Sequence, residues 1–355
     1  MAASSSPRIQ GHKPIDISSA LRANPNLDIT EEEFAKTTSY VEAISSYLTP
    51  KFQHYSRHTF PTERSFLARR KEEVTSGYIF LDRLSNETTQ KLPVKFGLSL
   101  DGRAVVVKSL TAAQVRKIEI AIQKKLRQLD PEKNYYIVGP LVTYRNHHGI
   151  RKIAHILDLK QGGDLLDYFN NHLAAKGKLS NKLIYSIAYK MARMLSVLHQ
   201  NGIVHLDVKL ENFLMENDEV FLSDFGHSHF IGNRLRKIWG SPGYIDPTSY
   251  FKEKKITANP EMDVWSMGIC LSILKHGAEF QKWMGQFDGN STKLAAMDET
   301  EFSWAKAKYL PNRWNPDSLD YIINQCLTLD PKARPTAEAV SEFVLGLIQK
   351  RKTLP

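Results

Sequence analysis

The sequence contains very little cysteine and no long apolar run. Its 355 residues include only two cysteines, Cys270 and Cys326, and each lies in an apolar stretch. A disulfide framework is therefore excluded, and both side chains are expected to pack in the interior. No uninterrupted apolar run approaches the roughly 18 residues that a membrane helix needs, so we expect no transmembrane segment.

The beginning of the sequence also lacks the apolar core of a secretory signal peptide. Residues 1–10 read MAASSSPRIQ, which is a polar stretch rich in small residues. Ordinary secretion is therefore not expected, and we predict a cytoplasmic location. The alternative interpretation of this Ser-rich leader is an address for a specialised export system, which would deliver the protein into a host cell.

The composition is that of a globular protein with a surplus of positive charge. Hydrophobic residues make up 42% of the chain and charged residues 24%, which argues against a wholly disordered or fibrous protein. The 48 lysines and arginines exceed the 38 acidic residues, so the formal net charge is +10. Such a surplus favours acidic partners. Because no basic run is interleaved with aromatic residues, we expect no nucleic-acid partner.

The pattern of the sequence changes near residue 77. Residues 1–27 are polar and predict a disordered or loosely attached arm, and residues 28–76 predict a helical extension. Five strand patterns and one helix pattern follow, at 78–84, 94–100, 104–108, 135–142 and 152–159 for strands and 113–129 for the helix. After residue 163 the pattern is mostly helical. The expected fold class is therefore α+β, with a small antiparallel sheet and one helix before a larger helical region.

The strongest chemical signal is the stretch IVHLDVKLENFLM at residues 203–215. Four of its residues have the spacing H-x-D-x-K-x-x-N: His205, Asp207, Lys209 and Asn212. Twelve residues after Asn212 comes Asp224, which begins the tripeptide Asp-Phe-Gly. Phosphoryl transfer needs metal ligands, a cation and a carboxylate near the attacking hydroxyl. Asn212 and Asp224 offer the oxygen ligands that Mg²⁺ prefers, Asp207 can accept the hydroxyl proton, and Lys209 can neutralise the phosphoryl group.

In this order and spacing, the motifs resemble the eukaryotic-type serine/threonine protein kinase family over residues 77–350. The resemblance implies a bilobal fold with ATP and Mg²⁺ as cofactors and a protein as substrate. Its expected parts are an N-lobe at 77–157, a hinge at 158–163 and a C-lobe at 164–350, followed by a tail at 351–355.

The resemblance also implies roles for residues outside the H-x-D stretch. Lys108 would join Asp207 and Lys209 in the catalytic set by holding the α- and β-phosphates, and Glu119 would position Lys108. Val106 and Leu214 would enclose the adenine, with Leu157 at the back of its pocket. The remaining nucleotide contacts would come from the backbone of Asp158 and Lys160 and from the carboxylate of Asp164.

Three later segments extend the resemblance and favour protein substrates over small molecules. They are GSPGYIDP at 240–247, DVWSMG at 263–268 and LDPKARPT at 329–336. In the family, the first docks substrate, the second carries a buried Asp that braces the catalytic loop, and the third carries a structural Arg, here Arg334. Lys209 together with Ser241 favours serine and threonine over tyrosine as acceptors.

The sequence departs from the family pattern at four places. No glycine occurs over residues 84–94, where the family has a glycine-rich phosphate loop, and Gln123 stands at a usually apolar position. Thr248 replaces the Glu that usually pairs with the structural Arg, so Arg334 lacks its usual partner. Leu206 replaces the Arg that usually binds an activation-loop phosphate. Because Ser228 is the only hydroxyl residue between Gly226 and Gly240, we predict activity without activation-loop phosphorylation.

Two other functions stay open at this point. The missing glycines and the other departures suit a pseudokinase scaffold that binds partners with little or no catalysis. The H-x-D stretch also occurs in kinases of non-protein substrates, although the three later segments argue against that alternative.

Overall fold

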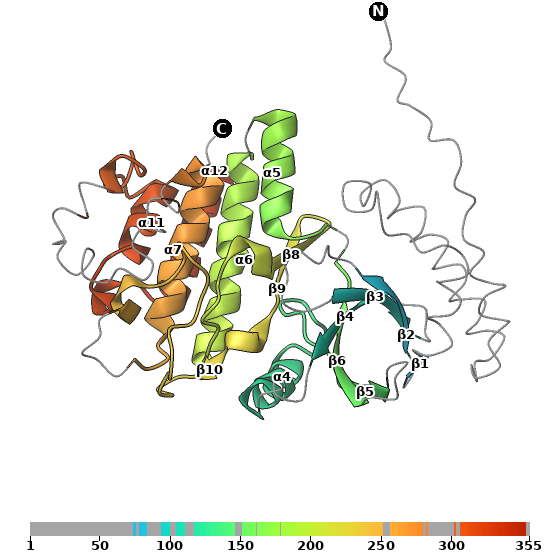
Figure 1. The fold of residues 1–355 in the computed structure, drawn as a ribbon. Coiled ribbons are helices and arrows are strands. Elements are labelled where there is room, and N and C mark those ends of the chain that lie inside the picture. The colour runs from blue at the N-terminus through green and yellow to red at the C-terminus, as the bar shows by residue number, and fades with distance from the viewer. Residues whose placement is uncertain are drawn as a thin grey trace, which may run out of the picture. The chain divides into compact units, whose positions relative to one another are not determined.

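The computed structural model describes twelve stretches of the chain (Figure 1): residues 74–75, 78–83, 94–99, 104–110, 117–145, 151–160, 162–177, 179–250, 256–279, 282, 302 and 306–352. The predicted arm, nearly all of the helical extension and the glycine-free loop lie outside these stretches. The chain divides into two compact units, Met1–Val115 with Gly139–Leu159 and Arg116–Val138 with Lys160–Pro355.

The first unit contains a six-stranded antiparallel sheet in the order β1-β2-β3-β4-β6-β5. Its strands are β1 (Val74–Thr75), β2 (Tyr78–Arg83), β3 (Val94–Ser99), β4 (Ala104–Leu110), β5 (Leu141–Arg145) and β6 (Arg151–Asp158). The strand prediction for 135–142 was largely wrong, because β5 begins only at Leu141. Instead, the Ile137 N–H donates to the Leu222 carbonyl and the Leu222 N–H donates to the Tyr135 carbonyl. All three residues belong to the second unit.

Strand β4 shows the alternation of a half-buried strand. Val105 and Val107 are 3% and 0% exposed and form a small core with Ala154 and Ile156. Val106 and Lys108 are only half-buried and lie on the opposite face. In the ladder, Val106 pairs with Leu157 of β6. The sheet therefore places three of the predicted nucleotide-binding residues on adjoining positions of two neighbouring strands.

The second unit is mainly helical. The helices that the structure describes in this unit are α4 (Lys117–Leu129), α5 (Leu165–Lys176), α6 (Asn181–Gln200), α7 (Pro260–His276), α11 (Leu319–Cys326) and α12 (Ala337–Lys352). Two small antiparallel sheets pair β7 (Ile203–Val204) with β10 (His229–Phe230) and β8 (Phe213–Glu216) with β9 (Glu219–Leu222). The short 3-10 helices are η2 (Leu210–Asn212), η3 (Phe225–His227), η4 (Pro247–Tyr250) and η5 (Pro331–Ala333). Helices α7 and α12 both lie along α6 (Figure 1).

A large apolar core lies within this helical unit. Ile122 and Leu126 of α4 belong to it, which explains why α4 groups with the helical unit. Both cysteines are buried in the same core, as predicted, and burial raises the pKa of the Cys326 thiol to about 12. A Cβ at Gly268 of α7 would lie only 2.9 Å from the Cβ of Cys326, so this close helix contact requires glycine.

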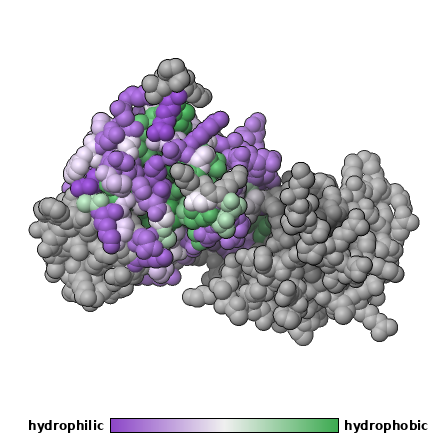
Figure 2. All heavy atoms as spheres, turned by 90° about the horizontal axis from the view of Figure 1, so that it is seen from above, coloured by the Kyte–Doolittle hydropathy of each residue, from purple (hydrophilic) through white to green (hydrophobic). Residues whose placement is uncertain are grey.

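Figure 2 shows one face of the molecule coloured by hydropathy. In the face shown in Figure 2, hydrophilic residues cover most of the coloured atoms and hydrophobic residues show between them. Within the stretches that the structure describes, no helix combines the length and apolarity needed to cross a membrane.

Candidate active site

A buried carboxylate on α7 fixes the loop that carries the H-x-D motif. Asp263 is 0% exposed and accepts the backbone N–H groups of His205 and Leu206 at 2.7 and 2.8 Å. The ring of His199 binds the same carboxylate at 2.9 Å. These bonds hold Leu206 at a φ of 64°, a left-handed conformation that costs about 1–3 kcal/mol for a residue with a side chain. The loop is therefore held in a strained, defined shape.

That loop presents Asp207 inside a network of hydrogen bonds. The Ser241 hydroxyl donates to Asp207 Oδ1 at 2.8 Å, and Lys209 Nζ donates to the Ser241 oxygen at 2.7 Å. Lys209 Nζ also lies 3.5 Å from Asp207 Oδ2. Asn212 Nδ2 donates to the same Oδ2 at 3.2 Å and to the Asp207 carbonyl at 2.6 Å. The structure thus brings together three of the predicted site residues and adds Ser241.

Asn212 and Asp224 are suited to hold Mg²⁺. Because the Asn212 amide nitrogen donates to two oxygens of Asp207, its Oδ1 is turned away from them and can act as a ligand. Asp224 has a φ of 57°, the second strained residue of the site, and its Oδ1 accepts the Gly226 N–H at 3.3 Å. The described residues hold no cluster of three or more His, Cys, Asp or Glu suited to a metal. Two protein oxygens and substrate phosphates are a common Mg²⁺ environment, so these residues fit that ion.

The predictions did not include His227, which follows the Asp-Phe-Gly tripeptide and also lies beside Asp207. Its Nδ1 is 3.5 Å from Asp207 Oδ2, and its ring packs against Trp239 with centroids 4.8 Å apart. Within the described stretches this buried Nδ1 has no hydrogen-bond partner. Burial lowers the pKa of His227 despite the nearby carboxylates, which favours the neutral ring. Its place directly after the motif was the only signal available from the sequence.

Phe225 anchors the segment that carries Asp224. It is 0% exposed and makes edge contacts with Tyr136 and His205, with ring centroids 5.8 and 5.2 Å apart. The Tyr136 hydroxyl donates to the Met194 carbonyl at 2.7 Å. Ser223 ties this segment to η2, because its N–H and hydroxyl both donate to the Asn212 carbonyl, at 2.8 and 2.9 Å. The two candidate metal ligands are therefore held to one another through backbone and side-chain bonds.

The predicted nucleoside residues of the helical unit lie around the start of α5 and strand β8. Asp164 caps α5 by accepting the Asp167 N–H at 2.9 Å, and it forms an isolated bridge with Leu214. Burial raises the pKa of Asp164 to about 6. The Lys160 side chain is committed elsewhere, because its Nζ binds Glu216 at 2.9 Å. The role predicted for the backbone of Lys160 in binding the adenine edge stays a prediction.

The remaining predicted site residues are divided between the two units. Val106, Lys108, Leu157 and Asp158 lie on β4 and β6 of the sheet. Glu119 lies in the first turn of α4, which packs against η3. Because Lys108 and Glu119 belong to different units, their pairing stays a prediction.

Arg334 has a partner that the sequence did not reveal. Its Nη1 and Nη2 bind the two carboxylate oxygens of Asp246 at 2.5 and 3.0 Å. The side chains are 0% and 2% exposed, so this is a fully buried, bidentate ion pair. Thr248, which replaces the expected Glu, donates its hydroxyl to Asp246 Oδ1 at 2.9 Å. Asp246 therefore takes over the pairing role, two residues earlier in the chain.

Gln123 occupies the buried position predicted for it on α4. It is 3% exposed, and its Oε1 has no hydrogen-bond partner among the described residues. Leaving a buried acceptor unpaired costs about 1–3 kcal/mol. This departure from the usual apolar residue therefore weakens the packing of α4.

Comparisons with known proteins identify a family and individual proteins that are similar to this chain. A family model described as protein kinase domain matches residues 95–344. Human NUAK family SNF1-like kinase 2 is 26% identical over 276 residues, which cover 76% of this chain and 40% of that protein. Probable serine/threonine-protein kinase MARK-B of Dictyostelium discoideum is 29% identical over 284 residues, or 78% of this chain and 37% of that protein. The chain thus matches well under half the length of these curated relatives.

Proposed function

The chain belongs to the protein kinase family, and we propose that it transfers the γ-phosphoryl group of ATP to serine and threonine hydroxyls of protein substrates. The observation that carries this proposal is the bonded set of Asp207, Lys209 and Ser241. In this set, the Asp207 carboxylate and the Lys209 ammonium group both contact the Ser241 hydroxyl. Together they can therefore surround a single hydroxyl group. The similar proteins from human and Dictyostelium discoideum, both of which are named as kinases, support the same activity.

In the proposed mechanism, Asp207 orients the acceptor hydroxyl and takes up its proton. The Ser241 hydroxyl and the Asn212 amide hold the carboxylate in one orientation. Lys209, 3.5 Å from Asp207 Oδ2, balances the charge on the transferred phosphoryl group. Positioning and charge stabilisation supply most of the rate enhancement in such reactions, so a network of this rigidity serves the chemistry directly.

The nucleotide and metal ligands complete the proposed site. Asn212 and Asp224 hold Mg²⁺, which neutralises phosphate charge when it is bound. Lys108 binds the phosphates and Glu119 positions Lys108. Val106, Leu157 and Leu214 contact the adenine. The Asp164 carboxylate binds the ribose hydroxyls, and the backbone of Asp158 and Lys160 binds the edge of the adenine.

We further propose that apolar packing replaces activation-loop phosphorylation. Leu206, which stands where the family has a phosphate-binding Arg, is 6% exposed and packs with Leu235 of the activation segment. Val204 and Ala258 complete this cluster, and Trp239 packs against it. Because an apolar contact cannot bind a phosphate, this cluster holds the segment without one.

Replacing Ser228 with alanine is therefore expected to change the turnover number by less than about threefold. Ser228 is 0% exposed, and its hydroxyl donates to the His205 carbonyl at 3.3 Å. The loss of one long hydrogen bond costs about 1 kcal/mol of stability and removes no phosphorylation site. Phosphosite mapping of the active protein and steady-state kinetics of the variant are the measurements. A phosphate on Ser228, or a loss of activity above about thirtyfold, would contradict the proposal.

The proposed function itself is tested by Mg²⁺-dependent transfer of labelled phosphate from ATP to serine, threonine and tyrosine peptides of otherwise equal sequence. We expect the first two to be labelled and the third not. The Asp224→Ala variant is the negative control.

A further inference from the structure

The activation segment, residues 225–245, carries charge of one sign. It contains no Asp or Glu, and its Lys and Arg residues are Arg234, Arg236 and Lys237. All three are exposed. Within the stretches that the structure describes, none of them has an ion-pair partner. The segment therefore presents positive charge that no carboxylate of its own compensates.

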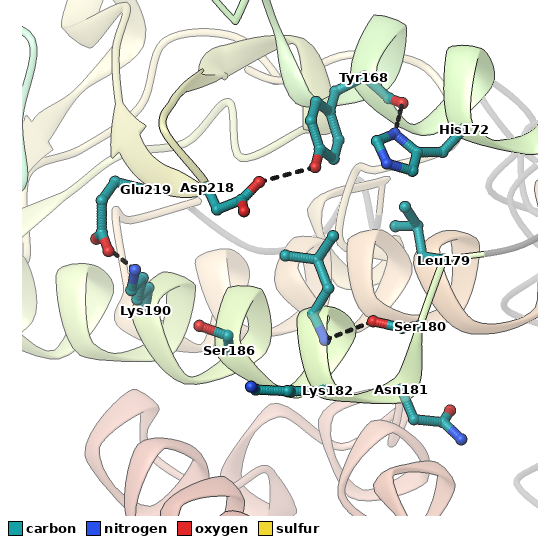
Figure 3. A pocket seen from close by; sticks show the side chains of 11 residues that line it. Tyr168, His172, Leu179, Ser180, Asn181, Lys182, Ser186, Lys190, Asp218 and Glu219 are labelled. Atoms are coloured by element: carbon teal, nitrogen blue, oxygen red, sulfur yellow. Dashed lines mark hydrogen bonds and ion pairs between the residues drawn. The ribbon is translucent and has the colours of Figure 1, made fainter. Parts of the chain in front are cut away.

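The cavity shown in Figure 3 differs from the activation segment in this respect. It has a volume of about 790 Å³ and is lined by residues of α5, α6 and the turn between β8 and β9. Its lining includes the lysines Lys182 and Lys190 and the carboxylates of Asp218 and Glu219, and Lys190 forms an ion pair with Glu219. Because these charges balance, the cavity selects no charge in a ligand.

The backbone of the activation segment is anchored beside the loop that carries the H-x-D motif. The Leu235 N–H donates to the Ile256 carbonyl at 2.9 Å, and the Leu235 side chain packs with Leu206. Leu235 is 6% exposed, whereas Arg234 and Arg236 on either side of it are exposed. The cations of the segment therefore belong to a stretch whose backbone already has a defined position.

Lys237 lies close to the candidate catalytic carboxylate. Its Nζ is 3.9 Å from the centroid of the Trp239 ring, a cation–π contact, and the His227 ring packs on Trp239 with centroids 4.8 Å apart. His227 Nδ1 is in turn 3.5 Å from Asp207 Oδ2. Lys237 Nζ is therefore at most roughly 14 Å from Asp207 Oδ2, which about four residues of an extended peptide span.

The carboxylates of the candidate site do not offset this positive charge. Lys209 Nζ lies 3.5 Å from Asp207 Oδ2, and Asp224 binds Mg²⁺ in the proposed function. Asp246, at the end of the segment, is held in a buried ion pair. A negatively charged side chain near the acceptor hydroxyl would therefore meet the exposed Lys237 and no uncompensated carboxylate.

We propose that Lys237 makes the enzyme prefer protein substrates that carry an Asp or Glu within about four positions of the phosphorylated serine or threonine. Arg234 and Arg236 add to the positive potential of the same segment. This inference rests on the proposed phosphoryl transfer and specifies the class of substrate that undergoes it.

The test measures kcat/KM of the full chain for peptides that contain a single serine. One Asp is placed in turn at each position from four before to four after the serine, and a peptide with Asn at the same position is the reference. We expect Asp to raise kcat/KM about three- to fivefold at one or two positions, and this gain to shrink as salt is added. Attraction by the net charge of +10 alone would give the same gain at every position.

Charge reversal identifies the group responsible. In Lys237→Glu, the preference for Asp at the responsive position should be lost, and Lys should be preferred there by about three- to fivefold over Asp. Lys237→Arg keeps the charge and should keep the preference for Asp. Lys182→Glu is the matched control, because Lys182 is an exposed lysine of the charge-balanced cavity, and it should show the wild-type preference. A purely structural effect would lower the rates for all peptides alike and would not invert the preference.

Three results would overturn this inference. They are equal kcat/KM for Asp and Asn at every position, an equal gain at all positions, and an unchanged preference for Asp in Lys237→Glu. Each of them is a ratio between phosphorylated peptides, so it leaves the proposed phosphoryl transfer standing. If the wild type phosphorylated no peptide, the proposed function would fail, and this inference would fail with it.

Discussion

Replacing Asp207 with asparagine is expected to lower the turnover number for phosphoryl transfer by about 10²–10⁴-fold. Asparagine has nearly the same shape and can still accept the Ser241 hydroxyl, which donates to Asp207 at 2.8 Å. It carries no charge and cannot take up the acceptor proton at neutral pH. The change therefore removes the proposed chemistry together with the bond that Asp207 Oδ2 accepts from Asn212, while the bond from Ser241 can remain.

The kinetic pattern distinguishes this role from a structural one. We expect the turnover number to fall while the KM for ATP changes little, because in the proposed mechanism Asp207 contacts the acceptor hydroxyl and not the nucleotide. Asp317→Asn is the matched control, since the Asp317 side chain forms an exposed ion pair with Lys350. If Asp207→Asn turned over at a near-normal rate, the assignment of Asp207 as the catalytic carboxylate would be wrong.

The second large effect concerns stability. Replacing Asp246 with alanine is expected to lower the free energy of unfolding by about 3–5 kcal/mol, because it leaves the guanidinium of Arg334 buried without a counter-charge. Both side chains of this pair are almost fully buried, at 0% and 2% exposed for Arg334 and Asp246. Carbonyl oxygens of Glu261 and Thr328 also accept from Arg334, at 2.9 and 2.8 Å, which limits the loss.

Urea unfolding monitored by circular dichroism measures this effect as a shift of the midpoint at constant slope. The exposed pair of Asp317 and Lys350 supplies the control, since Asp317→Ala should cost less than about 1 kcal/mol. The double variant Asp246→Leu with Arg334→Met should recover part of the loss, because it removes both buried charges. If Asp246→Ala lowered the free energy of unfolding by less than about 1 kcal/mol, the ion pair of Asp246 with Arg334 would not be what stabilises the 240–247 segment.

The sequence predicted well those features that depend on local patterns. The strand patterns at 94–100 and 152–159 correspond to β3 and β6 within one residue at each end. The H-x-D stretch brought Lys209 and Asn212 beside Asp207, because the turn and η2 that join them are short and local. Local geometry therefore accounts for this part of the candidate site.

The features that were missed depend on contacts between distant parts of the chain. Residues 135–140 are extended, but Tyr135 and Ile137 bond to Leu222, so they do not form the strand that their pattern predicted. The pairing of Asp246 with Arg334 joins residues 88 positions apart, which no spacing rule reveals. His227 reaches Asp207 only because η3 turns it back toward the loop.

The most direct test of the central claim is Mg²⁺-dependent transfer of radiolabelled phosphate from ATP to a serine peptide by the wild type and by Asp224→Ala. We expect labelling by the wild type that requires Mg²⁺ and a loss of at least about 10²-fold in the variant, because Asp224 is one of the two protein ligands proposed for the metal. Equal labelling by both proteins, or labelling by neither, would contradict it, and the second outcome would indicate a scaffold that binds partners without transferring phosphate.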